Sequence, residues 1–380
     1  MRERKKILWL VSWYPNKYDP FDGDFIQRHA RAAALYDDIH VLFIKQAEAQ
    51  KEVGKTWSGE GGLTEQLIYL PKEKGLLGKW RNYQAWWAFY KAQAGLIVQR
   101  EKPHCVHVHI PWRVGLVALW LEKKSRVPFV VTEHWGIYNR VVDDNIYRRS
   151  FLFRYLLRKI YRKARSFVTV SRFLGEGVNR ALVQMPFTVI PNVVDTALFF
   201  PEEEKATRFT FIHVSNMVKV KNVEGILAAF REFLVRSGAD AQLVLVGNRD
   251  DQYVQLAREE GLLDTSVFFR GEIPYEEVAK EMQRAHVFVL NSDMENSPCV
   301  IGEALCCGLP VIATNVGGIP ELLSAESGIL VPPRNEAALA EAMITIYAAF
   351  NRYNRQQIAC AAQQRFSVPA VGEIHHRLYQ

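Results

Sequence analysis

A run near the C-terminal end of the chain combines acidic side chains with the start of a helix. The run ENSPCVIGEALCCG begins at Glu295 and follows the apolar stretch VFVLNS. Ser297 and Pro298 form a good N-cap and first-turn pair, so the pattern predicts a helix from Pro298 onward. The backbone amides of Cys299 and Val300 would then point outward, where the amides and the helix dipole favour an anion.

Two glutamates flank this predicted helix start. Glu295 lies in the preceding loop, and Glu303 lies about one and a half turns inside the helix. Either glutamate alone could be an ordinary surface charge. Their combination with a capped helix at the end of a strand favours a binding site for a polar, anionic ligand.

Other strand ends in the second half carry residues that could complete such a site. The loop NMVKVKN runs from Asn216 and places Lys219 and Lys221 before the next helix, where lysines can hold a diphosphate as point charges. A solvent-exposed loop would look the same. Gly247 would allow a ligand to approach the backbone closely, and Ile273 could line a base. The segment NVGGIPE (315–321) follows the next strand and is expected to flank the same pocket.

The first half offers a glycine and several histidines at equivalent places. Gly23 precedes a predicted helix, where it suits either a phosphate-binding turn or a plain turn. His107 and His109 share one face of the strand CVHVHI, and a hydrogen-bonded core residue is the favoured reading of His107. His134, in TEHWG, follows a strand and is expected to point into a cleft. No GxGxxG motif is present, which argues against a dehydrogenase.

The composition describes a soluble globular protein large enough for two domains. The chain has 380 residues, 49% of them apolar and 23% charged. Its N-terminus, MRERKK followed by ILWLVSWYP, reaches a proline and charge too early for a convincing signal peptide, so a cytoplasmic location is expected. Five cysteines without CxxC spacing argue against a disulfide framework or a structural zinc site.

The elements alternate between strands and helices throughout. Most strands are apolar on both faces, as in a parallel sheet covered by helices on both sides. The expected fold is therefore α/β, with two doubly wound, Rossmann-like domains. The domains are expected at 1–192 and 193–360, followed by a C-terminal helix at 361–380. The stretch 356–380 is expected to form a helix, a break at Pro369 and a second helix. Such sheets bind ligands at the carboxyl ends of their strands.

Charge is distributed unevenly between the two halves. Residues 1–190 hold 32 Lys and Arg against 17 Asp and Glu, whereas residues 191–380 hold 16 against 24. The segments 79–95 and 145–166 mix these cations with aromatic residues. Such a mixture suits an anionic membrane surface, and a solvated basic face is the alternative. The positive excess in the first half suggests that it faces something anionic, namely membrane phospholipid, an anionic acceptor or nucleic acid. Nucleic acid is not the expected partner, because no recognised binding motif accompanies the charge.

Taken in order, these motifs resemble the family 4 retaining glycosyltransferases of the GT-B fold. The resemblance covers nearly the whole chain. It rests on the Gly23 loop, TEHWG, VSRFL (170–174), IPNVVD (190–195), the two glutamates and NVGGIPE. It implies two domains facing each other across a cleft. The N-terminal domain would hold the acceptor, the C-terminal domain would hold a nucleotide-sugar donor, and the last helix would cross back to the N-terminal domain.

The resemblance also implies roles for individual residues. Glu295 would contact the donor sugar, Glu303 the ribose, and the amides of Cys299 and Val300 the diphosphate. His134 would lie against the donor sugar, and Gly23 against the phosphates. A lysine that neutralises the diphosphate matches Lys221, but the family's arginine is replaced by Asn216, for which Lys219 could partly substitute. The remaining donor-side expectations are Asn296, Ser297, Pro298, Gly247 and Ile273, and His109 is expected on the acceptor side.

The sequence therefore predicts a retaining glycosyltransferase that needs no metal or other cofactor. It would use a UDP- or GDP-sugar and a glycan or lipid-linked acceptor in cell-surface polysaccharide or glycolipid synthesis, in the cytoplasm or peripherally on the inner membrane face. The alternatives are a GT-B sugar-nucleotide epimerase or phosphorylase and, less favoured, a nucleic-acid-binding protein.

Overall fold

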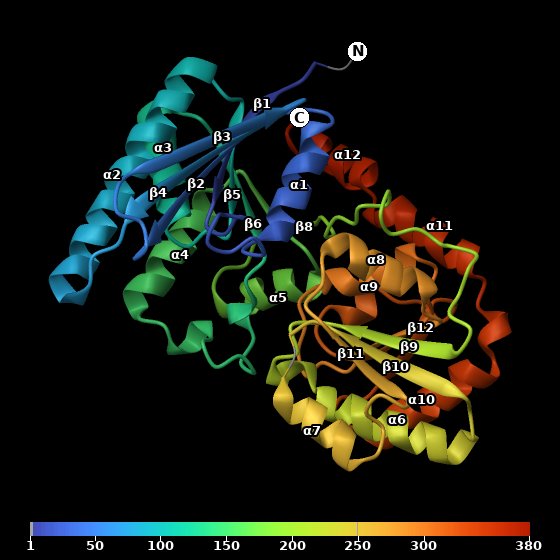
Figure 1. Cartoon of the computed structure of the whole chain (residues 1–380). Helices are drawn as coiled ribbons and strands as arrows, with labels where there is room; N and C mark the ends of the chain where they lie inside the picture. The colour runs from blue at the N-terminus through green and yellow to red at the C-terminus, as the bar shows by residue number, and fades with distance from the viewer. Residues whose placement is uncertain (1–2, 249) are drawn as a thin grey trace. The chain divides into compact units, whose positions relative to one another are not determined.

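The computed structural model describes residues 3–248 and 250–380, which form two compact units (Figure 1). Unit 1 comprises Met1–Val193 together with Val368–Gln380, and unit 2 comprises Val194–Ser367. The chain therefore passes between the units twice, and its last helix belongs to the same unit as its first strand.

Unit 1 is built on a mixed sheet with the strand order β3-β4-β2-β1-β5-β6-β7-β8, in which the β3–β4 pair alone is antiparallel. Its strands are β1 (Lys6–Val11), β2 (Asp38–Ala47), β3 (Gly54–Glu60), β4 (Leu63–Pro71), β5 (Cys105–His109), β6 (Phe129–Glu133), β7 (Ser166–Thr169) and β8 (Thr188–Val189). Its helices are α1 (Asp24–Ala34), α2 (Gly75–Glu101), α3 (Val114–Ser125), α4 (Phe151–Lys163), α5 (Arg172–Ala181) and α12 (Val368–Leu378), with short 3-10 turns η1 (Gly136–Tyr138) and η2 (Ile146–Arg148).

Both faces of the central strands of this sheet are buried, which explains why those strands are apolar. In β1, Leu8 and Leu10 pack beneath α2, α3 and α4, whereas Ile7, Trp9 and Val11 face α1 and the C-terminal end of the chain. Because alternate side chains enter different cores, the strand cannot shift by one residue without exchanging the two sets.

Unit 2 contains an all-parallel sheet with the order β11-β10-β9-β12-β13-β14. Its strands are β9 (Phe209–Val214), β10 (Ala241–Val246), β11 (Val267–Gly271), β12 (Val287–Leu290), β13 (Val311–Thr314) and β14 (Gly328–Val331). Its helices are α6 (Val223–Ser237), α7 (Asp251–Glu259), α8 (Tyr275–Arg284), α9 (Cys299–Cys306), α10 (Glu336–Ala348) and α11 (Arg355–Phe366), with 3-10 turns η3 (Lys219–Lys221), η4 (Ile319–Glu321) and η5 (Phe350–Arg352).

The strand orders confirm the doubly wound architecture expected from the sequence. Each sheet starts at an inner strand, β1 or β9, and adds strands first on one side and then on the other. The strand order therefore reverses between β1 and β5 in unit 1 and between β9 and β12 in unit 2. These two switch points are the places where open α/β sheets bind ligands.

Two elements have no counterpart among the elements expected from the sequence. Strand β3 is an edge strand with almost fully exposed residues, so it lacks the apolar alternation by which strands are recognised. Helix α5 contains two glycines, Gly175 and Gly177, which lower helix propensity. Its buried residues nevertheless pack into the unit 1 core, and Ser171 caps its first turn.

The C-terminal region crosses between the units later than expected. Helix α11 buries Ile358, Ala362 and Phe366 in the core of unit 2, so residues up to Ser367 belong to that unit. The break lies at Ser367 and not at Pro369, which occupies the first turn of α12. A proline is compatible with that position because first-turn amides have no partner within the helix.

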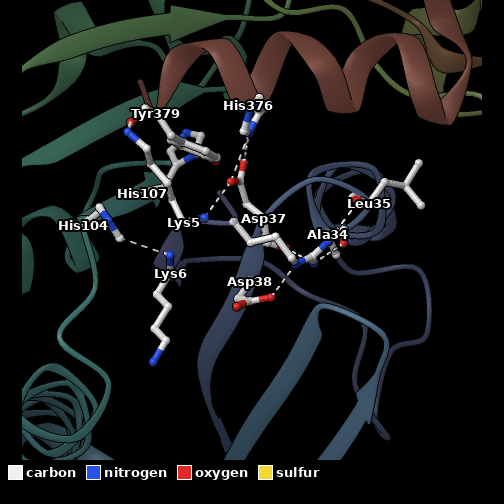
Figure 2. Close-up of polar contacts among 11 residues, drawn as sticks. Lys5, Lys6, Ala34, Leu35, Asp37, Asp38, His104, His107, His376 and Tyr379 are labelled. Carbon is white, nitrogen blue, oxygen red and sulfur yellow. Dashed lines mark hydrogen bonds and ion pairs between the residues drawn. The ribbon is translucent and has the colours of Figure 1, made fainter. Parts of the chain in front are cut away.

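Buried polar contacts attach α12 to unit 1 (Figure 2). The His376 ring donates from Nδ1 to the Asp37 carboxylate at 3.0 Å, and this carboxylate also accepts from the Lys5 amide at 3.0 Å. The Lys5 ammonium group donates to the backbone carbonyl of Tyr379 at 3.3 Å. Helix α12 lies beside α1, as the red and blue helices of Figure 1 show, and the Cβ of any larger residue at Gly372 would fall 2.2 Å from the Ala32 carbonyl oxygen.

Within the described part of the chain, no helix has both the length and the apolar character needed to cross a membrane.

We expect Asp37→Ala to lower the free energy of unfolding by about 3 kcal/mol, because it leaves buried donors without an acceptor. Asp38→Ala is the matched control. It removes an exposed ion pair with Arg4, and such pairs contribute less than about 1 kcal/mol. Urea denaturation of both variants measures the difference, and equal losses would contradict the anchoring role of Asp37.

Candidate active site

The switch point of unit 2 contains a lysine–glutamate ion pair. Lys221, after β9, donates from its ammonium group to the Glu295 carboxylate, after β12. The Ser292 hydroxyl donates to the same carboxylate oxygen at 2.7 Å. Both charged side chains are largely buried, with 18% and 11% of their surfaces exposed. The structure thus brings together the lysine and glutamate that the sequence singled out.

The segment that follows β13 packs against this pair. The Gly318 amide donates to the Glu295 carbonyl oxygen at 3.1 Å. The Thr314 hydroxyl, at the end of β13, donates to the Ser292 carbonyl oxygen at 2.6 Å. The Gly318 amide and the Thr314 hydroxyl therefore fix the loop that carries Glu295.

Helix α9 begins beside this loop, one residue later than expected. Pro298, and not Ser297, is the N-cap residue, and no side chain caps the helix. The reason is the extended backbone of Pro298, with φ −68° and ψ 121°, which places Cys299 first in the helix. Asn296, Ser297 and Pro298 are half-buried in the loop, and Cys299 and Val300 form the first turn.

Glu303 is buried within α9 and has a partner that the sequence did not reveal. Its carboxylate accepts a hydrogen bond of 2.7 Å from the Tyr275 hydroxyl, at the start of α8. Ile273 lies two residues before this tyrosine and packs half-buried against the same core. Tyr275 follows the loop that carries Ile273. This proximity in sequence is the signal that could have identified Tyr275.

The other donor-side residues differ in exposure and in role. Asn216 and Lys219 are exposed in the loop after β9. Gly247 has φ 133°, and a Cβ there would fall 1.6 Å from the Ser215 carbonyl oxygen. The close approach of the Ser215 backbone therefore requires glycine at this position.

In unit 1, Gly23 is the N-cap of α1, with φ 68°. A Cβ at this position would lie 2.7 Å from the Trp13 carbonyl carbon, because the loop folds back on the end of β1. Both the left-handed backbone and the close approach therefore require glycine.

His134 lies in a cluster of buried histidines. Its Nε2 is 3.1 Å from His109 Nδ1, and its ring centre is 5.0 Å from that of Phe25 and 5.7 Å from that of His29. His134 is 8% exposed, so its ring is mostly enclosed. The expectation that His109 lies on the acceptor side is wrong. Its ring is fully buried, stacked 4.0 Å from Trp9, and it supports His134.

The cluster continues to α1 and α12. His29 Nδ1 lies 3.0 Å from His375 Nε2, and His107 forms 2.6 Å hydrogen bonds with the Tyr379 and Thr132 hydroxyl groups. His107 is thus a hydrogen-bonded core residue, as the sequence favoured. Burial lowers the pKa of His29 to about 4 and that of His107 to about 3, and it also lowers the pKa of His134. These rings are therefore uncharged at neutral pH.

Glu133 is a buried carboxylate that the sequence reading did not single out. It accepts from the amides of His134 and Trp135 at 3.0 and 2.9 Å, and from the hydroxyls of Tyr138 and Tyr161 at 2.6 and 2.7 Å. Burial raises the pKa of Glu133, although all four hydrogen bonds oppose that shift. Glu133 fixes the turn that carries His134. Its place beside that histidine in TEHWG is the signal that could have revealed it.

Across residues 3–248 and 250–380, no group of three or more His, Cys, Asp or Glu side chains is arranged to hold a metal ion. The five cysteines are free thiols.

Comparison with known proteins identifies the family. The model for "Glycosyltransferase Family 4" matches residues 33–198, and that for "Glycosyl transferases group 1" matches residues 194–363. A Bacillus subtilis protein named as a teichuronic acid biosynthesis glycosyltransferase is 25% identical, over 93% of this chain and 90% of its own. The alpha-monoglucosyldiacylglycerol synthase of Streptococcus pneumoniae is 23% identical, over 74% and 71%.

Solved structures share the fold along the whole chain. Sucrose-phosphate synthase from Thermosynechococcus elongatus superposes with a TM-score of 0.77 at 22% identity, over 99% of this chain and 98% of that one. HepE from Anabaena, solved with UDP and glucose, gives a TM-score of 0.68 at 18% identity, over 99% of both chains. The chain belongs to the family 4 glycosyltransferases and has their GT-B fold of two Rossmann-like domains.

Proposed function

We propose that this enzyme transfers a sugar from a nucleotide-sugar to a glycan or lipid-linked acceptor, with retention of anomeric configuration, in cell-surface polysaccharide or glycolipid synthesis. The observation that carries the proposal is the Lys221–Glu295 pair beside the start of α9, at the switch point of unit 2. Relatives named for teichuronic acid and glycolipid synthesis support the acceptor class. UDP bound to HepE favours a UDP-sugar.

In this proposal, unit 2 holds the donor. Lys221 and the first-turn amides of Cys299 and Val300 bind the diphosphate, Glu303 the ribose and Glu295 the sugar. Asn216, Lys219, Gly247, Ile273 and the loop Asn296–Pro298 form the rest of the donor site. From unit 1, we propose that His134 contacts the donor sugar and Gly23 the phosphates.

The chemistry follows from where charge develops. As the bond between the anomeric carbon and the diphosphate oxygen breaks, negative charge grows on the leaving group. A lysine held in place by Glu295 and the positive end of a helix are already oriented to stabilise that charge. The acceptor oxygen bonds to the anomeric carbon from the same face, and its proton passes to the departing phosphate. We propose that no metal is needed, and transfer that persists in EDTA is the test.

We expect Lys221→Ala to slow transfer about 100- to 1000-fold, because one group that stabilises the leaving diphosphate is lost. A thermal-shift screen with UDP, GDP and ADP first identifies the nucleotide. A bound nucleotide at 100 times its Kd stabilises the native state by about 2.7 kcal/mol. Initial rates with the corresponding nucleotide-sugars then compare the variant with the parent.

Lys280→Ala, which removes an exposed lysine of unit 2, is the control. An unchanged rate in both Lys221→Ala and Glu295→Gln would refute the site. Turnover of the nucleotide-sugar without any acceptor would instead favour an epimerase, and turnover of glycan with phosphate a phosphorylase.

We also propose that unit 1 binds an anionic membrane surface peripherally. The first turns of α2 expose Leu76, Leu77 and Trp80, and the first turns of α4 expose Phe151 and Leu152. Both helices follow parallel strands and cover the same face of the sheet, so their starts lie at the same edge, as Figure 1 shows. Leu76 and Leu77 lie before the Trp-rich segment 79–95. Within that segment, Trp86 is buried in the core.

The segments that carry these apolar side chains also expose basic residues. Lys79, Arg148 and Lys159 are exposed on the same two segments. Each basic residue near an anionic surface contributes about 1 kcal/mol, and inserted apolar side chains add to the binding.

The triple variant Leu76→Ser, Leu77→Ser, Trp80→Ser should lower binding to phosphatidylglycerol vesicles at least about tenfold, because three inserted side chains are lost. Vesicle flotation measures the bound fraction. Leu96→Ser is the matched control, since Leu96 is an exposed leucine near the other end of α2. Equal binding by the triple variant, or equal binding of the parent to phosphatidylcholine vesicles, would contradict the proposal.

A further inference from the structure

The switch point of unit 1 holds a pocket. It measures about 500 Å³ and lies at the carboxyl ends of β1, β2 and β5. This volume is within the range of small-ligand sites. Its position in unit 1 corresponds to that of the Lys221–Glu295 pair in unit 2.

Three half-buried tryptophans form much of its wall. Trp13, Trp112 and Trp135 come from three different loops. The ring centres of Trp13 and Trp135 are 6.1 Å apart, and Trp112 packs 4.0 Å from the ring of Phe153 in α4. Aromatic faces fixed in this way offer flat apolar surfaces, and the hydrogen-bearing face of a pyranose ring packs well on such a surface.

The charged lining is entirely cationic. Lys45, Lys72 and Arg113 line the pocket, and no carboxylate is among its described lining residues. Lys45 lies 2.7 Å from Asp22 and Lys72 lies 3.8 Å from Glu48, but neither carboxylate reaches the lining. A ligand in this pocket therefore meets tryptophan faces together with three cationic side chains, of which Lys45 and Lys72 also pair with carboxylates outside the lining.

The loop between β5 and α3 is strained where it borders the pocket. Arg113 has φ 68° and ψ −61°, and the Val114 amide donates to the Trp112 carbonyl oxygen at 3.0 Å, which closes a γ-turn of the rare, strained kind. Ile110, a β-branched residue, has φ 58°.

A single serine holds this strained loop in place. The Ser12 hydroxyl lies 2.8 Å from the carbonyl oxygen of Ile110 and 3.0 Å from that of Trp112. Strain of this sort persists where the surrounding structure enforces it, and it is concentrated at ligand sites. Here it orients Trp112 and Arg113.

We infer that this pocket binds the acceptor, and that the acceptor is a saccharide carrying a carboxylate or a phosphate. The inference rests on the proposed function. The tryptophans would stack on the sugar ring, and the three cations would pair with its anionic group. In the reaction, an acceptor hydroxyl oxygen bonds to the donor's anomeric carbon, the nucleoside diphosphate leaves with the bonding electrons, and the hydroxyl proton passes to it. The anionic group is unchanged.

Binding measured without any donor tests this inference separately from the proposed function. Calorimetry and ligand-observed NMR compare methyl glucuronide, glucose 1-phosphate and the neutral methyl glucoside. We expect at least one anionic sugar to bind at least ten times more tightly than the neutral one, with a preference that weakens as salt is added. The stronger of the two anionic ligands identifies a carboxylate or a phosphate as the recognised group.

Two substitutions test whether the preference for anionic sugars arises in this pocket. Arg113→Gly removes a cation and relieves the strained backbone, so it should weaken anionic binding about tenfold without lowering the melting temperature. Adding Lys45→Gln should abolish the preference for the anion. Lys123→Gln, an exposed lysine near the far end of α3, is the control.

Equal binding of neutral and anionic sugars, no binding of the anionic sugars, or a preference that both pocket substitutions leave intact would each overturn the inference. Failure of the proposed function would be seen elsewhere, as the absence of any nucleotide binding.

Discussion

The winding of each parallel sheet decides where this molecule can bind ligands. In unit 1 the strand order reverses between β1 and β5, and in unit 2 it reverses between β9 and β12. At each reversal the following helices diverge to opposite faces of the sheet, so the strand ends remain accessible. The Lys221–Glu295 pair and the tryptophan pocket both occupy such positions, although one is an ion pair and the other a pocket walled largely by aromatic rings.

Neighbouring groups hold the charged side chains at the switch point of unit 2 in place. Glu295 is fixed by Lys221, by the Ser292 hydroxyl and through its own carbonyl by Gly318, and Glu303 is held by Tyr275. Groups held in this way need little reorganisation when charge develops on a leaving group, which is the basis of electrostatic catalysis. The same loop contacts explain why glycine is required near the site, since the backbones of neighbouring strand ends approach closely.

In unit 1, buried and uncharged histidines pack around His134 and hold it in place. The cluster extends from His134 through His109 to Trp9, and from His29 to His375 in the last helix. Burial keeps the pKa of His134 and of His375 well below the usual value, so no charges repel one another inside the cluster at neutral pH. Together with the hydrogen bonds of the Glu133 carboxylate, these contacts connect the turn that carries His134 to β1 and to α12.

Much of this organisation could be predicted from the sequence because it depends on local patterns. Apolar strands alternating with amphipathic helices determine two α/β units, and residue type and place at a strand end single out Glu295, Lys221 and His134. Gly23 could be recognised at a helix start. Edge strand β3 escaped prediction because an exposed strand carries no apolar alternation.

Only the tertiary structure decided which residues meet. Lys221 and Glu295 pair across 74 positions of sequence, and the three half-buried tryptophans of the pocket come from three separate loops. The alternation in β5 predicted that His107 and His109 share a face, but not that α1 and α12 cover it. For that reason His109 was wrongly expected to reach an acceptor. Burial and pairing depend on elements distant in the chain, and no local pattern contains that information.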